Sequence, residues 1–176
     1  MTLDEMVAQL SERSLVSLGR SFAHPIWPNP ALEQDVNQFL YHYSFLKQDA
    51  GYVKFLECYA GAFVFDHTSD STLDILGFSI ASSHIIDYPG EIINEEGFLV
   101  FCVSLVNFYE NEKRQEVEIS YAFDATGTRQ WGIYAKTLAI TRIQDVNPRY
   151  MFYCNTFTDW LQRVIDKNVF APLNLK

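Results

Sequence analysis

The sequence has few basic residues and no long apolar stretch. It carries 13 Lys and Arg against 22 Asp and Glu, a formal net charge of -9 at pH 7. Proteins that bind nucleic acids directly gain affinity when a basic surface releases counterions from the phosphates, so this charge balance argues against direct nucleic-acid binding. The longest apolar run, residues 98–106, is far shorter than the roughly 20 residues of a membrane-spanning helix. We therefore expect neither a nucleic-acid partner nor a membrane segment.

Paired cysteines and metal-binding spacings are also missing. The three cysteines, Cys58, Cys102 and Cys154, are odd in number and far apart, so they predict no disulfide framework. Each stands among apolar or aromatic neighbours, the usual setting of a buried free thiol. The four histidines lack metal-ligand spacing, and the eight glycines form no phosphate-binding cluster. The sequence thus predicts a domain that is not an enzyme and has no catalytic residues, metal or cofactor.

The N-terminal segment does not have the features of a secretory signal. It lacks a basic stretch followed by an apolar core and a small-residue cleavage site, and residues 1–18 are amphipathic. We therefore expect a cytoplasmic protein.

The chain does have enough apolar residues for one well-filled core. It has 176 residues, of which 48% are apolar and 15% aromatic. A single domain of this size buries enough surface to be stable without disulfides or metals. We expect one domain over residues 1–176.

Helical patterns dominate the first third of the chain. Thr2 and Glu5 form a capping-box pattern, and the apolar stripe that follows predicts a helix that Gly19 would end. Three prolines in residues 25–30 predict a loop, and Asn29 can cap a second helix that begins at Pro30.

The block from residue 52 to residue 61 predicts the junction between the helices and the sheet. Tyr52, Phe55, Leu56 and Tyr59 recur at the spacing of one helical face. Gly61 follows them and can adopt the left-handed conformation that ends a helix.

The period then changes to that of strands. Residues 62–66, 73–80 and 98–106 read as strands, and the apolar third one is expected at the centre of a sheet. Residues 117–123 alternate between apolar and polar side chains, and residues 130–139 form a return strand after a turn.

An amphipathic pattern over residues 155–165 closes this part of the chain and predicts a core-facing helix. Helices first, strands in the middle and a helix last indicate an α+β fold. We expect a central antiparallel sheet of about four to six strands with the N-terminal helices and the C-terminal helix packed on it.

The order of these motifs resembles the SUKH superfamily, which contains a fungal cell-wall-synthesis regulator and many bacterial toxin-immunity proteins. The resemblance rests on the helix from Asn29 to Phe39, on Tyr52-x-x-Phe55-Leu56 leading to Gly61, and on Phe157-x-x-Trp160-Leu161-x-x-Val164-Ile165. Ala60 stands where the family has an asparagine. Residues 1–20 lie outside the resemblance as an N-terminal helical extension.

The resemblance implies a non-enzymatic protein-binding domain. Its bacterial members neutralise toxins, many of them nucleases, by direct contact, and an acidic protein would suit a basic toxin domain. Two alternatives remain: a regulatory interaction module unrelated to toxins, and a small-molecule-binding domain. The second rests on aromatic residues that would line a pocket between sheet and helices, namely Phe98, Phe101, Phe108, Tyr109, Tyr121 and Phe123.

Acidic residues near turns are the candidate partner-binding residues, together with one tryptophan between prolines. The tryptophan is either an exposed anchor or a plug at the edge of the core. The acidic residues are either a footprint for a basic partner or ordinary solvated loop charges. The candidates are Trp27, Asp66, Asp70, Asp74, Glu91, Glu95, Glu96, Glu110 and Glu112.

Overall fold

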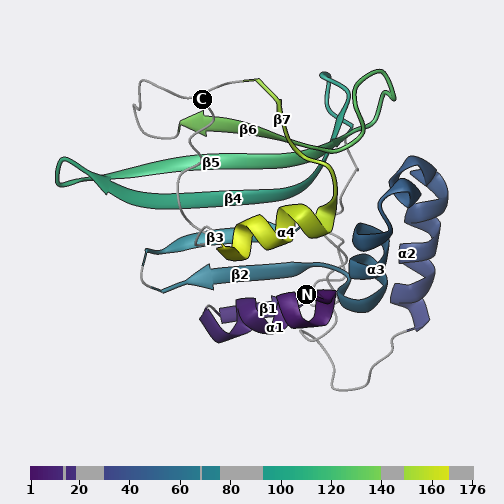
Figure 1. Cartoon of the computed structure of the whole chain (residues 1–176), viewed down its shortest axis with the longest axis horizontal. Helices are drawn as coiled ribbons and strands as arrows, with labels where there is room; N and C mark the ends of the chain where they lie inside the picture. The colour runs from purple at the N-terminus through teal and green to yellow at the C-terminus, as the bar shows by residue number, and fades with distance from the viewer. Residues whose placement is uncertain (14, 19–29, 68, 76–92, 140–148, 167–176) are drawn as a thin grey trace.

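The computed structural model describes residues 1–13, 15–18, 30–67, 69–75, 93–139 and 149–166 (Figure 1). The helices in these ranges are α1 (Leu3–Arg13), α2 (Pro30–His42), α3 (Ala50–Tyr59) and α4 (Phe157–Asp166), with a 3₁₀ helix η1 (Ser44–Gln48). The strands are β1 (Leu15–Leu18), β2 (Ala62–Asp66), β3 (Ser71–Ile75), β4 (Phe98–Glu110), β5 (Lys113–Asp124), β6 (Ile133–Ala139) and β7 (Met151–Cys154). None of these helices is long and apolar enough to cross a membrane.

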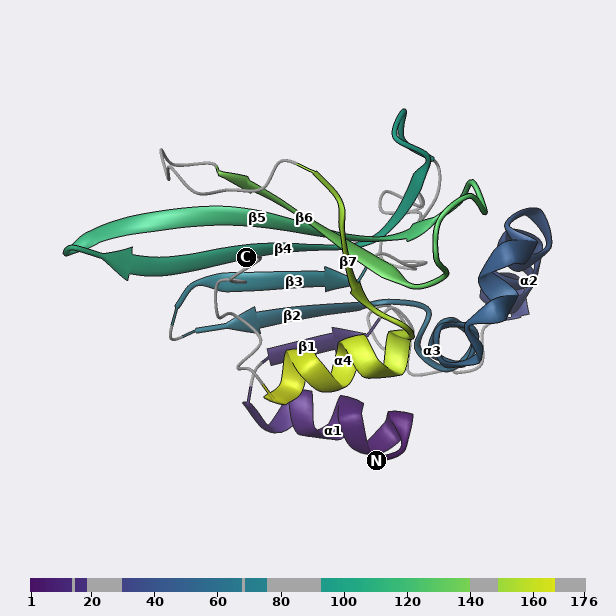
Figure 2. The same ribbon diagram turned by 45° about the horizontal axis from the view of Figure 1, so that its top comes forward.

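The strands form one antiparallel sheet in which each strand pairs with its neighbours in the sequence, in the order β1-β2-β3-β4-β5-β6-β7. Helices α1 and α4 lie side by side along one face of the sheet, and α2 and α3 stand at one end of it (Figures 1 and 2). The α+β prediction is confirmed, with β4 at the centre of the sheet as expected.

The seventh strand comes from a segment that the sequence assigned to a helix. The first helix ends at Arg13 rather than at Gly19, and β1 pairs with β2 from Leu15↔Phe65 to Leu18↔Ala62. The apolar stripe of α1 is complete by Leu10, and the short, mainly apolar segment at residues 15–18 adds an edge strand. The predicted strand at 73–80 is present as far as Ile75, and the proline-rich loop before residue 30 lies outside the described residues.

Aromatic rings from α3, β4, β5 and α4 pack together in the core. The ring centroid of Tyr52 lies 5.6 Å from that of Phe101, 5.0 Å from that of Phe123 and 5.3 Å from that of Phe157. Trp160 in turn packs edge-on against Phe101 at 5.1 Å. All five side chains are at most 1% exposed. The two helical faces that the sequence predicted to be buried therefore pack against each other in the core.

At the end of α3, the residue in the left-handed conformation is not the glycine that the sequence predicted. Ala60, at φ 57° and ψ 8°, is that residue, and its N–H donates to the carbonyl of Leu56 at 2.9 Å. Gly61 follows at φ 132°, a value that also suits glycine. A left-handed alanine is uncommon because its Cβ crowds the backbone, whereas asparagine tolerates this conformation.

One buried carboxylate joins α3 to α4. Asp49, 2% exposed, accepts hydrogen bonds from the N–H of Tyr52 at 3.0 Å and from the N–H of Phe157 at 2.7 Å. Both donors lie in first turns of helices, where backbone N–H groups have no partner within the helix. Burial raises the pKa of Asp49, and the hydrogen bonds from Tyr52 and Phe157 oppose that rise. The two helices that frame the core thus share one cap.

Candidate protein-binding surface

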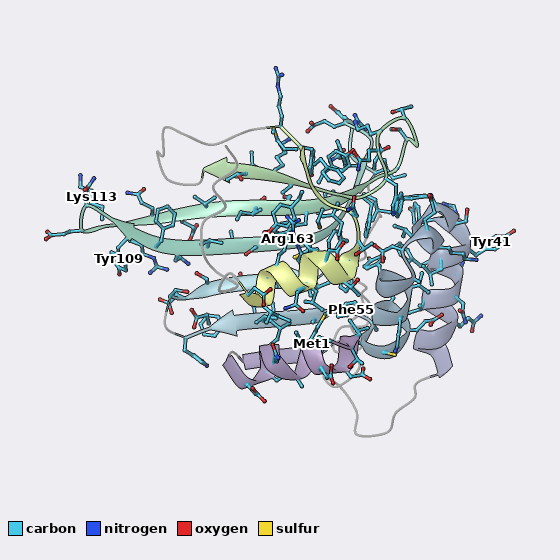
Figure 3. All side chains as sticks on the ribbon, in the orientation of Figure 1. Met1, Tyr41, Phe55, Tyr109, Lys113 and Arg163 are labelled. Carbon is cyan, nitrogen blue, oxygen red and sulfur yellow. The ribbon has the colours of Figure 1, made fainter. Side chains whose placement is uncertain are left out.

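The two longest strands extend beyond their neighbours as a hairpin arm, residues 106–117. Among the described residues, β4 and β5 pair out to Glu110↔Lys113, whereas β3 pairs with β4 up to Leu105 and β6 pairs with β5 up to Val117. The tip, near the labelled Tyr109 and Lys113, projects past the other strands in Figure 3. The hairpin arm therefore extends past the described parts of the strands beside it.

A two-residue turn closes the hairpin arm. Asn111 and Glu112 have φ values of 49° and 62°, and positive values at both central positions are the mark of a type I′ hairpin turn. Glycine usually occupies the second position, so Glu112 holds a conformation that is costly for a residue with a side chain. Beside this turn Tyr109 is 76% exposed.

The neighbouring β2–β3 turn is bonded to the hairpin arm. Asn107 donates through its side-chain amide to the carbonyl of Asp70 at 2.7 Å and accepts from Nε of Arg114 at 3.2 Å. Arg114 also lies 3.7 Å from a carboxylate oxygen of Asp70. In the same turn Ser69 donates to the carboxylate of Asp66 at 2.7 Å. These contacts place Asp66 and Asp70 at the same end of the sheet as Glu112.

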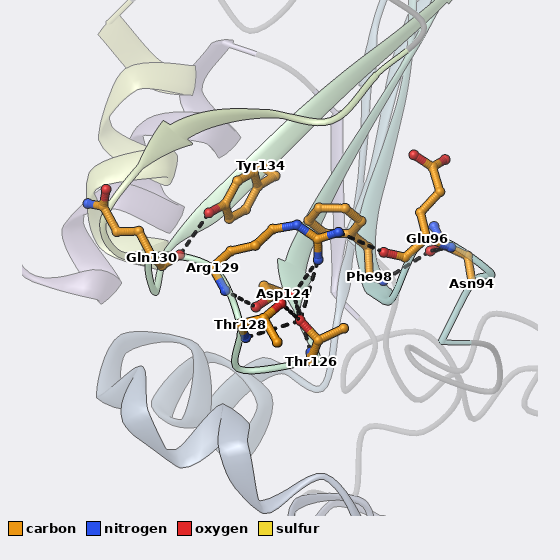
Figure 4. A network of polar contacts seen from close by, with 9 residues as sticks. All are labelled: Asn94, Glu96, Phe98, Asp124, Thr126, Thr128, Arg129, Gln130 and Tyr134. Atoms are coloured by element: carbon orange, nitrogen blue, oxygen red, sulfur yellow. Dashed lines mark hydrogen bonds and ion pairs between the residues drawn. The ribbon is translucent and has the colours of Figure 1, made fainter.

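The other acidic pair lies at the far end of β4. Glu95 and Glu96 belong to the turn before Phe98, which is fixed by Asn94: its side-chain oxygen accepts from the N–H groups of Glu96 at 3.1 Å and Phe98 at 3.0 Å (Figure 4). At about 3.4 Å per residue, a strand of 13 residues separates the two ends by roughly 40 Å. Glu95 and Glu96 therefore do not share one small contact area with Glu112.

Glu96 contacts a group of two stacked aromatic rings that has a cationic side chain on each side. Its carboxylate lies 2.5 Å from Nζ of Lys136, and its carbonyl accepts from Arg129 at 3.2 Å. The guanidinium of Arg129 lies 4.5 Å from the ring centroid of Phe98, which stacks on Tyr150 at 4.2 Å. Lys136 lies 5.2 Å from the other ring of this pair. We call these five residues the ring stack; it fastens the Glu96 turn to β6 and to the start of β7.

Asp124 anchors the loop that carries Arg129. Its side chain, 2% exposed, accepts from Nη1 of Arg129 and from Oγ1 of Thr126, both at 2.7 Å (Figure 4). Burial by itself would raise the pKa of Asp124, but the hydrogen bonds from Thr126 and Arg129 outweigh it and hold the pKa below its usual value. The sequence predicts a turn before residue 130, and the Asp-x-Thr spacing of Asp124 and Thr126 is the local signal of the Asx turn found there.

The remaining candidates are scattered or outside the described residues. Asp74 is half-buried on the sheet face away from the helices, since Leu73 and Ile75 on either side of it are buried in the core. Trp27 and Glu91 lie outside the described residues, as does the side chain of Glu110.

The aromatic residues proposed to line a pocket do not gather in one place. Phe101, Tyr121 and Phe123 belong to the core under α4. Phe98 packs in a separate cluster, and Tyr109 is exposed.

The thiols differ from the prediction at one position. Cys102 and Cys154 are buried, and burial raises the pKa of both, to about 12 for Cys154. Cys58 is exposed, because α3 turns Phe55 and Leu56 toward the core and its other face toward solvent. Within the described part of the chain, no three His, Cys, Asp or Glu side chains are grouped to hold a metal ion.

Comparisons with known proteins return no relative. No family model, curated protein or solved structure matches the chain.

Proposed function

We propose that this chain is an acidic protein-binding domain that inhibits a basic partner by direct contact. One observation carries the proposal: two bonded turns bring Asp66, Asp70 and Glu112 to the end of the sheet where Tyr109 is exposed. Carboxylates at the same end of the sheet as an exposed aromatic side chain suit a partner surface that combines cationic groups with an apolar recess.

The charge of the whole chain acts in the same direction. A net charge of -9 gives a long-range field that attracts cationic surfaces and speeds association with them. Because exposed charges are screened by salt, this contribution falls as ionic strength rises.

The partner class we propose is a toxin domain with a basic substrate cleft, such as a nuclease. The motif order that resembles the SUKH superfamily supports this choice, because members of that group neutralise toxins. An acidic surface that covers such a cleft would keep the phosphates of the substrate out.

The test begins with tagged full-length protein expressed in its native cells. Proteins that co-purify with it are identified, and the enzymatic activity of each is measured with and without the purified domain. We expect one partner whose activity is lost at a one-to-one ratio. A co-purifying enzyme that stays fully active in the presence of excess domain would contradict the proposal.

A matched pair of charge reversals tests the electrostatic part. Glu112→Lys and Glu95→Lys change the net charge equally, at opposite ends of the sheet. We expect Glu112→Lys to slow association by roughly tenfold at low salt and Glu95→Lys by much less. The difference should vanish near 1 M salt, where the Debye length is about 3 Å. Equal effects of the two substitutions would show that the partner does not bind preferentially at the end of the sheet that carries Glu112.

A further inference from the structure

Two aromatic side chains stand out as exposed among the described residues. Tyr41 on α2 is 82% exposed and Tyr109 on the hairpin arm is 76% exposed, whereas every other large apolar side chain in the described ranges is at most 54% exposed. Tyrosine gives a binding surface a large contact area at a small entropy cost, and it is enriched among the residues that dominate binding energy. Both positions are therefore possible anchors by exposure alone.

Their surroundings separate them. Tyr109 is the cross-strand partner of Arg114, which contacts Asp70 and Asn107, so the strand under Tyr109 is connected to the neighbouring β2–β3 turn. Exposed Glu112 follows three residues later in the turn. Tyr41 instead lies beside His42, and the nearby ring of Tyr43 packs on Phe39. Of the two, Tyr109 combines exposure with a cross-strand neighbour that contacts the β2–β3 turn, and the exposed residues Asp70 and Glu112 lie in the two turns at its end of the sheet.

We propose that Tyr109 is the anchor of the interface and inserts, tip first, into an apolar recess of the partner that is rimmed by Lys and Arg. This inference rests on the proposed function and adds the point of contact and the chemistry of the partner's site. The rim would face Asp70 and Glu112, whose charges are exposed on the two turns. Tyr109 would supply the apolar contact, and the charges of Asp70 and Glu112 would select a basic partner.

The experiment places a photo-reactive benzoyl-phenylalanine at position 109 or, as the matched control, at position 41 of the tagged full-length chain in its native cells. After illumination, adducts are identified by mass spectrometry. We expect a discrete adduct from position 109 only, attached to a partner segment that contains Lys or Arg. An adduct from position 41 only, or an adduct of position 109 with a second copy of this chain, would overturn the inference.

Affinity measurements with the captured partner complete the test. Tyr109→Ala should weaken binding by roughly 30-fold or more, mainly through faster dissociation, as for a residue that dominates an interface. Tyr41→Ala should change it by less than about twofold. If Tyr109→Ala binds and inhibits like the wild type, Tyr109 is not the anchor and the proposed function stands. If the captured protein is not inhibited by the wild-type chain, the proposed function fails instead.

Discussion

A carboxylate oxygen of Asp49 lies 2.7 Å from the backbone nitrogen of Phe157, a residue 108 positions later in the chain. The other oxygen of the same carboxylate accepts from Tyr52. One short side chain thus fixes the N-terminal turns of two helices that meet over the core.

Removing this shared cap should be costly. Asp49→Ala leaves two buried N–H groups without an acceptor and should lower the free energy of unfolding by about 2–4 kcal/mol. Asp49→Asn keeps one acceptor and should cost about half as much. Urea-induced unfolding measures both. The control is Asp159→Asn, which changes an exposed carboxylate in the first turn of α4 and should change stability by less than about 0.5 kcal/mol. A similar small effect for Asp49→Ala would show that the cap does not support the core.

The lowered pKa of Asp124 predicts that the protein loses stability in acid. Its pKa is lower in the folded state than in the unfolded chain, so the folded state favours the ionised form. The resulting stabilisation is present above the unfolded pKa of about 3.9 and is lost as the pH falls through the folded pKa. The difference in unfolding free energy between wild type and Asp124→Asn should therefore shrink as the pH is lowered from about 6 to below 4. A difference that stays constant over this range would mean that the carboxylate charge does not hold the loop.

The turn at the tip of the hairpin arm should accept glycine. Glu112→Gly removes the cost of a left-handed conformation and should stabilise the protein by about 0.5–1 kcal/mol. Glu95→Gly is the matched control, because Glu95 is not among the described residues with positive φ and glycine there only adds freedom to the unfolded chain. Thermal unfolding should rank Glu112→Gly above wild type and Glu95→Gly below it. The reverse order would contradict the type I′ assignment.

The thiols should react in two classes. Cys58 is exposed, while burial raises the pKa of Cys102 and Cys154 and keeps reagents away from them. A thiol reagent added to the native protein should modify one cysteine rapidly and the other two only after unfolding. Cys58→Ser should abolish the rapid phase. A second rapid thiol in that variant would show that the core under α4 opens readily.

Local periodicity predicted the parts of the fold that depend on one segment at a time. The buried faces of α3 and α4 and the long strand β4 follow from spacings that a single helix or strand imposes. Two short segments were misjudged where pairing with another segment decides the outcome. Leu15–Leu18 is a strand because β2 lies beside it, and Ala60 is left-handed because the chain must enter β2.

The candidate site was less predictable for the same reason. The shared cap at Asp49 and the ring stack each join segments that are far apart in the sequence, and no local spacing encodes such contacts. In the sequence, Glu95, Glu96 and Glu112 are equally good candidates for partner binding. In the structure, β4 separates Glu95 and Glu96 from Glu112 and places them at the opposite end of the sheet. Exposure of Tyr109 likewise depends on how far β4 extends past β3, which only the strand register reveals.

The simple strand order of the sheet has a consequence for synthesis on the ribosome. Strands added one after another can pair as they emerge, because each needs only the strand just before it. The rings of Tyr52, Phe101 and Phe123, however, gain Phe157 and Trp160 as neighbours only when α4 is made. A nascent chain that ends before residue 157 can therefore pair its strands, but it lacks the two rings that complete the aromatic cluster of the core.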